Sequence, residues 1–455
     1  MKKDGQGLFP MCEGSNTTTS NRGDASKPPV ILHLSDLHFG YDSSEQQQSD
    51  RKLVLDHLGA TITSLDLDWR PDIVCVSGDI GYRGHRSDYV EAKAWLDRFL
   101  PSIGLSYGRL VLCPGNHDLD RHKSREITGP RDEGEADEHL SIDNWKSFHQ
   151  PFEDYRRFCQ EACIPEFRLG NYANYLVGIR EVCGLRFVCC NSAWFHVNDS
   201  ANGRLWIGLP LIRYMESKGE LPLVGNQGNA SKTIALLHHP ERDLARNETS
   251  SYPGRCSTLD YLGQRCHLIL TGHSHSLPDE PSERKQALLV KAGATYNDHR
   301  YANSFYLLRI EETQLVWWPF IGCPESSGLY WRKHGEPQEK WWPFCVRAFV
   351  RTNLDENSRR QPPERKTVEE QIAGLQLELR RHEQTFEWEK GAVVAGQLRV
   401  EVEGNKRRLA GPLIMNAYEL LAEFEFAKEK MKKMTGKPWD LSLAKHYLAK
   451  AKGIR

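Results

Sequence analysis

The sequence predicts an α/β fold, and three observations support this prediction. Short apolar runs, typical of buried strands, alternate with amphipathic helical stretches through the first part of the 455-residue chain. Such alternation indicates a largely parallel sheet with helical crossovers. Acidic and imidazole side chains directly follow the apolar runs, and ligands bind at the carboxyl ends of strands in sheets of this kind. We therefore expect these polar residues to converge on one site.

The first predicted elements are three strands with two helices between them. The apolar runs, which indicate strands covered on both faces, lie at 30–34, 73–76 and 110–113. The helices are predicted at 46–65 and 87–100. In both helical stretches, apolar residues recur at helical spacing. Pro71 and Pro101 follow these stretches and are expected to end them.

The segment 121–170 interrupts this alternation. Its first part is charged, and in its second part aromatic residues recur at three- and four-residue intervals, at Trp145, Phe148, Phe152, Tyr155 and Phe158. This spacing predicts an amphipathic helix. Two interpretations stay open: a partial cap that lies over the site, and a helix packed on the far side of the core.

Strand-like runs resume after this segment. They lie at 175–179, 185–190, 233–237, 266–270, 287–291, 304–310 and 314–318. We expect the first two runs to pair with each other and the last two to form a hairpin. A further helix is expected at 205–215.

The composition excludes several broad classes of protein. The net charge is −1, so no global field favours nucleic acid or a membrane. No stretch approaches the ~20 apolar residues of a membrane helix. The 12 cysteines include no CxxC pair, and four lie in strand-like runs, at Cys75, Cys113, Cys189 and Cys190. Buried free thiols in a reducing compartment explain them, and we expect a cytoplasmic protein.

Five motifs carry the predicted chemistry, and each follows an apolar run. In chain order they are Asp36-Leu37-His38, Gly78-Asp79, Gly115-Asn116-His117-Asp118, His238-His239-Pro240 and Gly272-His273-Ser274-His275. Any one of them could be structural, but such a succession at strand ends is hard to reach by chance. Asp, Asn and His together favour Mn, Fe, Zn or Ni over Ca or Mg. Two such ions ~3.5–4 Å apart would clamp a phosphoryl group and activate a water.

The order and spacing of these motifs resemble the calcineurin-like metallophosphoesterases, over roughly residues 29 to 312. The resemblance implies a two-sheet β-sandwich flanked by helices, in four α/β/β/α layers. It implies a dinuclear metallophosphoesterase, a phosphoric ester hydrolase in which a bridging hydroxide attacks phosphorus. It also implies two divalent transition metal ions, with manganese as the first expectation and iron, zinc or nickel as alternatives.

The resemblance also implies a role for each motif residue. One ion would be held by Asp36, His38 and His275. The other would be held by Asn116, His238 and His273. Asp79 would bridge the two ions. His117 would protonate the leaving-group oxygen or steady the phosphoryl oxygens, and Asp118 would orient its imidazole. His239 is expected either to touch the substrate or to pack.

With this resemblance, the chain divides into four predicted parts. Residues 1–29 are polar and lack the apolar segment of a signal peptide, so we expect a disordered leader. Residues 30–322 form the predicted catalytic domain, with 121–170 as a cap insertion. Residues 323–366 are expected to be a strand-poor connector, which ends in a polar linker. Residues 367–455 are expected to be a helical extension, with helices at 367–388 and 413–434.

The basic tail of this extension has two interpretations. From Lys428 onward, nine basic residues stand against Glu429 and Asp440. A solvated, partly disordered face explains such a charge excess, and so does a contact for nucleic acid or an acidic partner.

The substrate is the least determined part of the prediction, because the metal set serves many phosphoesters. A phosphodiesterase is our first expectation. The segment 186–192, followed by Gly203-Arg204-Leu205 and a helix, is similar to the middle of the class III cyclic-nucleotide phosphodiesterases. That family usually has an aspartate where Asn191 stands.

The first alternative is a DNA or RNA nuclease. Two C-terminal helices after the core resemble, in layout, the repair exonucleases that bind a coiled-coil ATPase. Those enzymes share Asp-x-His followed by an aliphatic or aromatic residue and glycine, as in the segment 36–40. This interpretation implies a nucleic acid substrate and a protein partner for the C-terminal helices. A phosphomonoesterase and a binding module without catalysis are further alternatives.

Overall fold

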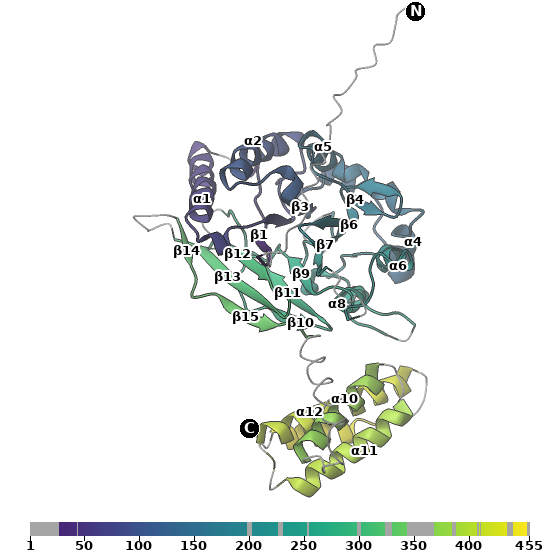
Figure 1. Cartoon of the computed structure of the whole chain (residues 1–455). Helices are drawn as coiled ribbons and strands as arrows, with labels where there is room; N and C mark the ends of the chain where they lie inside the picture. The colour runs from purple at the N-terminus through teal and green to yellow at the C-terminus, as the bar shows by residue number, and fades with distance from the viewer. Residues whose placement is uncertain are drawn as a thin grey trace, which may run out of the picture. The chain divides into compact units, whose positions relative to one another are not determined.

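The computed structural model describes two compact units, Met1–Arg351 and Thr352–Arg455, which we treat separately (Figure 1). The described residues are 27–42, 44–197, 203–225, 231–252, 254–297, 302–323, 330–343, 368–384, 388–406, 409, 411–434 and 440–452. The leader expected at 1–29 and the linker expected at 353–366 lie almost wholly outside these residues. Among them, no helix has both the length and the apolar character that a membrane crossing requires.

The first sheet of the larger unit has the order β14-β13-β12-β1-β2-β3, and β15 also pairs with β13. Its strands are β1 (Val30–Leu34), β2 (Ile73–Ser77), β3 (Leu110–Cys113), β12 (Ser304–Ile310), β13 (Gln314–Gly322), β14 (Trp331–Lys333) and β15 (Gln338–Trp341). Strands β1, β2 and β3 are parallel, and β12 and β13 form the predicted antiparallel hairpin.

The second sheet has the order β10-β11-β9-β8-β7-β6-β4-β5. Its strands are β4 (Phe167–Leu169), β5 (Tyr172–Asn174), β6 (Val177–Val182), β7 (Leu185–Cys190), β8 (Thr233–Leu236), β9 (Leu268–Thr271), β10 (Ser282–Arg284) and β11 (Ala287–Lys291). Strands β7, β8, β9 and β11 are parallel, whereas β6 and β7 form the predicted antiparallel pair.

The two sheets stack into a sandwich because their strands are apolar on both faces. Ile31, on β1, packs with Phe187 and Leu268 of the other sheet in a shared core. Its neighbours Val30 and Leu32 join a second core that includes the helices. Residues next to each other on a strand point to opposite faces, so a continuous apolar run serves both layers. The predicted fold class, two mixed sheets flanked by helices, is confirmed.

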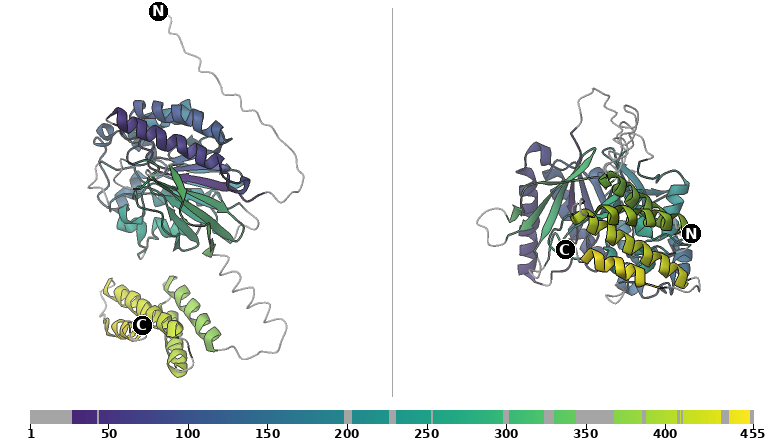
Figure 2. Two further views of the ribbon diagram at one scale, coloured as in Figure 1. Left: turned by 90° about the vertical axis from the view of Figure 1, so that its left-hand side faces the viewer. Right: turned by 90° about the horizontal axis from the view of Figure 1, so that it is seen from below.

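Helices cover the outer faces of the sandwich (Figure 2). They are α1 (Glu45–Thr63), α2 (Arg86–Ser102), α3 (Arg121–Ser124), α4 (Glu133–His139), α5 (Glu153–Glu161), α6 (Leu209–Ser217), α7 (Arg246–Thr249) and α8 (Thr258–Gly263). Leu55, Leu58 and Ile62 on α1 pack into the same core as Val30 and Leu32. Helix α2 continues to Ser102, so Pro101 does not end it where expected.

The aromatic part of the segment 121–170 packs onto the core. Helix α5 lies against α2, and the ring of its Phe158 stacks on Tyr89 at 5.3 Å between centroids. Trp145 and Phe152 are fully buried beside Trp194. The aromatic periodicity therefore reflects a buried face. Helix α5 thus packs on α2 and the core, and the cap insertion over 121–170 as a whole stays a prediction.

The region 323–366 also departs from the expected strand-poor connector, because β14 and β15 extend the first sheet. The Trp331 indole of β14 donates to the carbonyl of Val54 on α1 at 2.9 Å. The backbone N–H of Tyr330 donates to His57 Nδ1 at 2.9 Å. The larger unit therefore extends at least to residue 343 within the described residues.

The smaller unit has four helices among its described residues. They are α10 (Val368–Gln384), α11 (Trp388–Asn405), α12 (Gly411–Met434) and α13 (Ser442–Lys452). They share a core of their own, which includes Ile372, Leu398, Leu421 and Tyr447. The basic tail contains α13, where Lys450 pairs with Glu403 on α11.

Candidate metal centre

The polar motifs lie at the carboxyl ends of five strands. Strands β1, β2 and β3 are neighbours in the first sheet, and β8 and β9 are neighbours in the second. Hydrogen bonds also join the two sheets there: the backbone N–H of Thr295 donates to Ser35 O at 2.8 Å, and that of His273 donates to the side-chain oxygen Asp36 Oδ2 at 3.0 Å. The strand ends of both sheets therefore meet at one edge of the sandwich.

Five of the seven predicted ligands have left-handed backbone conformations. The φ angles are 55° at Asp36, 49° at His38, 57° at Asp79, 68° at His273 and 47° at His275. Residues with a Cβ seldom adopt this region, and each such position costs of the order of 1–3 kcal/mol unless its surroundings enforce it. Such residues cluster at functional sites, so this backbone is an independent sign of one.

Arg51 is a buried residue that holds the first of these loops in place. Its Nη1 donates to Leu37 O and its Nη2 to His38 O, the latter at 2.7 Å. The guanidinium also pairs with buried Asp42, with 2.6 Å between Nε and Oδ2. It stacks over the Tyr296 ring at 4.2 Å. The Arg51 guanidinium is therefore the charged hydrogen-bond donor to both loop carbonyls, Leu37 O and His38 O.

The first group of predicted ligands is Asp36, His38 and His275. His275 Nε2 lies 3.0 Å from Asp36 Oδ1, and His38 Nε2 lies 3.9 Å from the same oxygen. One donor atom from each residue lies within 4.8 Å of the others. Asp36 is fully buried, and His38 is almost so.

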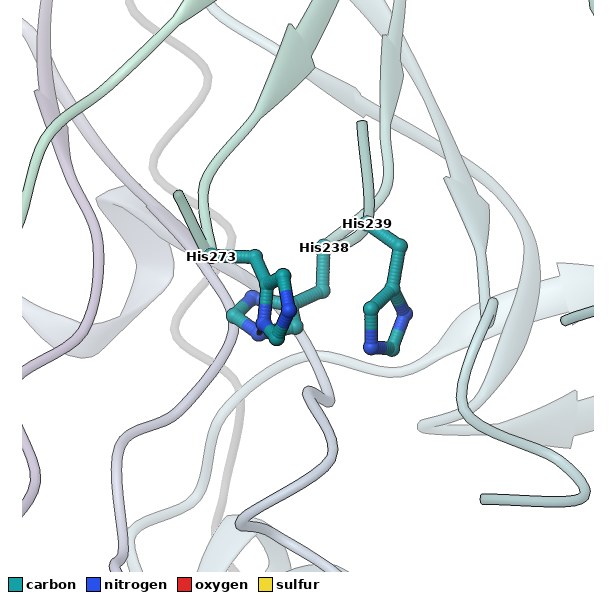
Figure 3. Close-up of side chains that lie close together, drawn as sticks. All are labelled: His238, His239 and His273. Atoms are coloured by element: carbon teal, nitrogen blue, oxygen red, sulfur yellow. Dashed lines mark hydrogen bonds between the residues drawn. The ribbon is translucent and has the colours of Figure 1, made fainter. Parts of the chain in front are cut away.

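The second group of predicted ligands gathers around His238. Its Nε2 lies 3.1 Å from Asp79 Oδ2, 3.1 Å from Asn116 Oδ1 and 3.2 Å from His273 Nδ1. Figure 3 shows the imidazoles of His238, His239 and His273 close together at the ends of two neighbouring strands. Asp79 Oδ2 is also 3.2 Å from His38 Nε2, so this carboxylate lies between the two groups.

Neighbouring imidazoles and carboxylates in the site stabilise each other's charged forms. Burial raises the pKa of Asp79, but His238 and His117 outweigh burial and hold that pKa well below its ordinary value. The imidazoles of His275 and His238 likewise outweigh burial at Asp36 and lower its pKa. In turn burial lowers the pKa of His238, but Asp79 and Asp36 raise it to about 9. The buried site is thus built to accept positive charge.

A hydrogen bond on the side of His238 away from the cluster determines which ring nitrogen faces the cluster. His238 Nδ1 lies 2.7 Å from Ser77 O, a carbonyl that can only accept. In the neutral imidazole that would bind a metal, the proton is therefore on Nδ1, and Nε2 faces Asp79 and Asn116. These donors are the ones that borderline divalent ions prefer, so the residues fit the metal ions expected from the sequence.

His117 has a different partner from the one predicted. Its Nδ1 lies 2.7 Å from the carbonyl of Tyr82, and the Tyr82 ring stacks on its imidazole at 4.8 Å. The Asp118 carboxylate instead accepts from the backbone N–H groups of Gly115, Ile80 and Gly81. The prediction that Asp118 orients His117 is wrong, because Asp118 ties together the loops after β2 and β3. Burial lowers the pKa of His117 to about 4, against the opposing effect of Asp79.

His239 is part of the cluster, a possibility that the sequence left open. Its Nε2 lies 3.1 Å from Asn116 Oδ1, and Ser192 Oγ lies 2.9 Å from its Nδ1. His196, which the sequence reasoning missed, stacks on His239 at 5.9 Å. The polar residues that follow the run 185–190 were the signal for this wall of the site.

Asn297 was also missed. Its side-chain amide lies 3.0 Å from His275 Nδ1, on the side away from Asp36. It stands six residues beyond the run 287–291 and outside the five motifs, so the motif pattern carried no signal for it. The position of this amide orients the His275 imidazole.

Together, this fold and this cluster define the class of site: a two-sheet sandwich flanked by helices, with buried carboxylates and imidazoles that suit divalent metal ions at one edge. A family model described as calcineurin-like phosphoesterase matches residues 29–277, more than half of the chain. The chain therefore belongs to the calcineurin-like phosphoesterase family. Divalent metal ions are typical of this family.

Individual relatives are distant. An uncharacterized metallophosphoesterase-like protein of Bacillus subtilis, YydB, is 32% identical over 97 residues, which cover 21% of this chain and 19% of that protein. The chain thus matches about a fifth of the length of that relative. A dimetal phosphatase from Danio rerio is similar with a TM-score of 0.39 and 12% identity, over 70% of this chain and 100% of that chain. Vps29 from Cryptosporidium parvum is similar with a TM-score of 0.28, 12% identity and the same coverage.

Proposed function

We propose that this phosphoesterase is a phosphodiesterase with a dinuclear metal site. Asp36, His38 and His275 would hold one ion. Asn116, His238 and His273 would hold the other, and Asp79 would bridge them. The observation that carries the proposal is the position of Asp79, whose Oδ2 contacts His38 in one group at 3.2 Å and His238 in the other at 3.1 Å.

When bound, the two ions would neutralise the phosphoryl oxygens and lower the pKa of the attacking water. The chain itself supplies orientation. The Asp79 carboxylate is fixed by the backbone N–H of His117, which donates to its Oδ1 at 2.8 Å. This bond leaves Oδ2 for the two imidazoles. The backbone thereby orients the carboxylate that we propose as the bridge.

His117 is the proposed proton donor to the leaving group, in the imidazolium form that an anionic phosphate beside Nε2 would favour against burial. The Tyr82 carbonyl holds its Nδ1–H, so Nε2 is the nitrogen that exchanges a proton with the substrate. The imidazole stands 5.0 Å from that of His38, between ring centroids, and is partly exposed. It is therefore beside the proposed ions and accessible to the substrate.

The preference for a phosphodiester rests on the segment 186–192. Its end forms one wall of the site, because Ser192 Oγ lies against His239 and Asn191 Oδ1 accepts from Ala193 N at 2.8 Å. This is the segment that is similar to class III cyclic-nucleotide phosphodiesterases. Its place in the site supports a substrate of that class.

A substrate panel tests the proposal. The manganese-loaded protein is assayed on a bis-aryl phosphate, an aryl monophosphate and 3′,5′-cyclic nucleotides, with Asp79→Asn as the matched variant. We expect the diester to be cleaved faster than the monoester. Asp79→Asn should lose both metal binding and activity, because it removes the shared charge. Faster cleavage of the monoester would contradict the phosphodiesterase assignment.

A nuclease is the second candidate, and the separate core of the smaller unit favours it as a place for a partner. Single-stranded and duplex DNA and RNA are added to the panel, with the full chain and with a chain that ends at Arg351. A nuclease that depends on the smaller unit should lose nucleic acid cleavage on truncation but keep diester hydrolysis. Equal losses of both activities would remove this candidate.

A further inference from the structure

Asp243 is a buried carboxylate next to the candidate metal centre that no predicted role uses. It lies in η6 (Glu241–Asp243), the short 3₁₀ helix directly after His238-His239-Pro240. Only 4% of the residue is exposed. Within the described part of the chain, its Oδ2 has no hydrogen-bond partner. A buried carboxylate oxygen without a donor is costly, so its position calls for an explanation.

The nearest imidazole to this oxygen belongs to His273. His273 Nε2 lies 3.9 Å from Asp243 Oδ2. The other ring nitrogen, Nδ1, lies 3.2 Å from His238 Nε2 and so faces the cluster. The His273 ring therefore stands between the cluster on one side and the Asp243 carboxylate on the other.

We propose that Asp243 is the positioning residue of His273. In this arrangement the carboxylate accepts a hydrogen bond from His273 Nε2–H and holds the lone pair of Nδ1 toward the ion. A carboxylate behind a ligating imidazole fixes its tautomer and raises its basicity. This inference rests on the proposed function, because it assigns His273 Nδ1 as a metal ligand.

Backbone hydrogen bonds hold the turn around Asp243. Asp243 N donates to Pro240 O at 3.0 Å, and Gly203 N donates to Asp243 O at 2.8 Å. Ala245 N donates to Leu205 O at 2.8 Å. These backbone bonds are independent of the carboxylate oxygen Oδ2, which faces His273.

Arg242 is the competing partner. Its Nε lies 3.5 Å from Asp243 Oδ2, but its side chain is 68% exposed. An ion pair with so exposed an arginine contributes little. The pair with Arg242 also does not explain why the carboxylate lies close to His273.

Metal binding tests the proposal without reliance on activity. Mn²⁺ is titrated into the wild-type chain, Asp243→Ala and Asp243→Asn, with calorimetry for stoichiometry and affinity. The visible spectrum of the Co²⁺-loaded protein reports the ligand field. We expect Asp243→Ala to weaken one of the two Mn²⁺ equivalents by ~10–100-fold and to change the Co²⁺ spectrum, and Asp243→Asn, which keeps an acceptor oxygen, to weaken it less.

Arg242→Gln is the matched control. It removes the competing partner and should leave both Mn²⁺ affinities at the wild-type values. Two unchanged affinities in both Asp243 variants would overturn the proposal, as would an equal loss in Arg242→Gln. If Asp243→Ala does not fold, Asp243→Asn decides by the same comparison with wild type. A wild-type chain that binds fewer than two Mn²⁺ would instead contradict the proposed dinuclear function.

Discussion

At the scale of single residues, the imidazoles of the site are oriented by partners on the side away from the cluster. The carbonyl of Ser77 accepts from His238, and the carbonyl of Tyr82 accepts from His117. Both partners are backbone atoms at the ends of the loops that carry the ligands. The local folding of the strand ends therefore sets the tautomers, and a change of side chain at either carbonyl residue leaves the acceptor in place.

Replacement of His117 separates metal binding from proton transfer. His117→Gln should keep both Mn²⁺ equivalents but slow turnover of the bis-aryl phosphate by ~10²–10⁴-fold, because glutamine cannot carry the proton. The measurement pairs calorimetric Mn²⁺ titration with kcat. His446→Gln, at an exposed position in the smaller unit, serves as the control. Normal turnover in His117→Gln would end the proposed role of this residue.

At the scale of elements, the loop after β1 depends on α1 through Arg51. The guanidinium reaches from the first turns of the helix to Leu37 O and His38 O, and it pairs with Asp42. The left-handed conformations at Asp36 and His38 are therefore supported by a charged group rather than by local preference.

Removal of Arg51 should destabilise the larger unit. In Arg51→Met, buried Asp42 loses its partner, and we expect a loss of ~3–5 kcal/mol in the free energy of unfolding. Chemical denaturation measures it. Lys52→Met is the control, since Lys52 forms an exposed pair with Asp56 and should change stability by less than ~1 kcal/mol. Similar losses in the two variants would show that Arg51 has no special part in the loop.

The elements that sequence reasoning predicted are those with a continuous apolar signal. Strands β1, β2 and β3 are buried at every position and were found close to their observed bounds. Strands β14 and β15 were missed because they are short and mostly exposed, with charged residues in Trp331–Lys333 and Gln338–Trp341. Their place in the sheet comes from pairing with β13, which is a tertiary contact that local sequence does not carry.

The same distinction, between features with a local sequence signal and features set by tertiary contacts, applies within the site. The motifs that the sequence singled out come together at one edge because each side chain follows a buried strand. The partner of His117 could not be predicted, because a backbone carbonyl leaves no mark in the sequence. Asp118 was misassigned for a related reason: adjacency to His117 in the chain suggested contact, whereas its carboxylate points to backbone N–H groups of two loops. Asp243 and Asn297 lie beyond the predicted motifs.

At the scale of the whole molecule, the stability of the larger unit should fall with acid because it buries neutral histidines. His267 is 4% exposed, and its Nδ1 accepts from Thr233 N at 3.0 Å. Burial, with a smaller effect of Lys232, lowers its pKa to about 3. The unfolded chain takes up this proton near the ordinary pKa of 6.5, so the contribution is complete above that pH. It is lost progressively as the pH falls toward 3.

His267→Asn isolates this effect, because asparagine retains an acceptor for Thr233 N but does not titrate. Between pH 7 and pH 5 the wild type should lose roughly 2 kcal/mol more stability than the variant. Urea unfolding at both pH values checks the difference, and the other buried histidines cancel in the comparison. Parallel losses in the two proteins would mean that His267 is protonated in the folded state.

The left-handed backbone at the predicted ligands creates a trade-off between thermal stability and the proposed metal site. Glycine adopts this conformation without strain, so a glycine at Asp36, His38 or Asp79 would relieve torsional cost while it removed a donor atom. Where the relieved strain exceeds the lost hydrogen bonds, such a substitution would raise thermal stability at the expense of the proposed metal site. The donor side chains at all five of these positions therefore carry a torsional cost that a purely structural loop would not need.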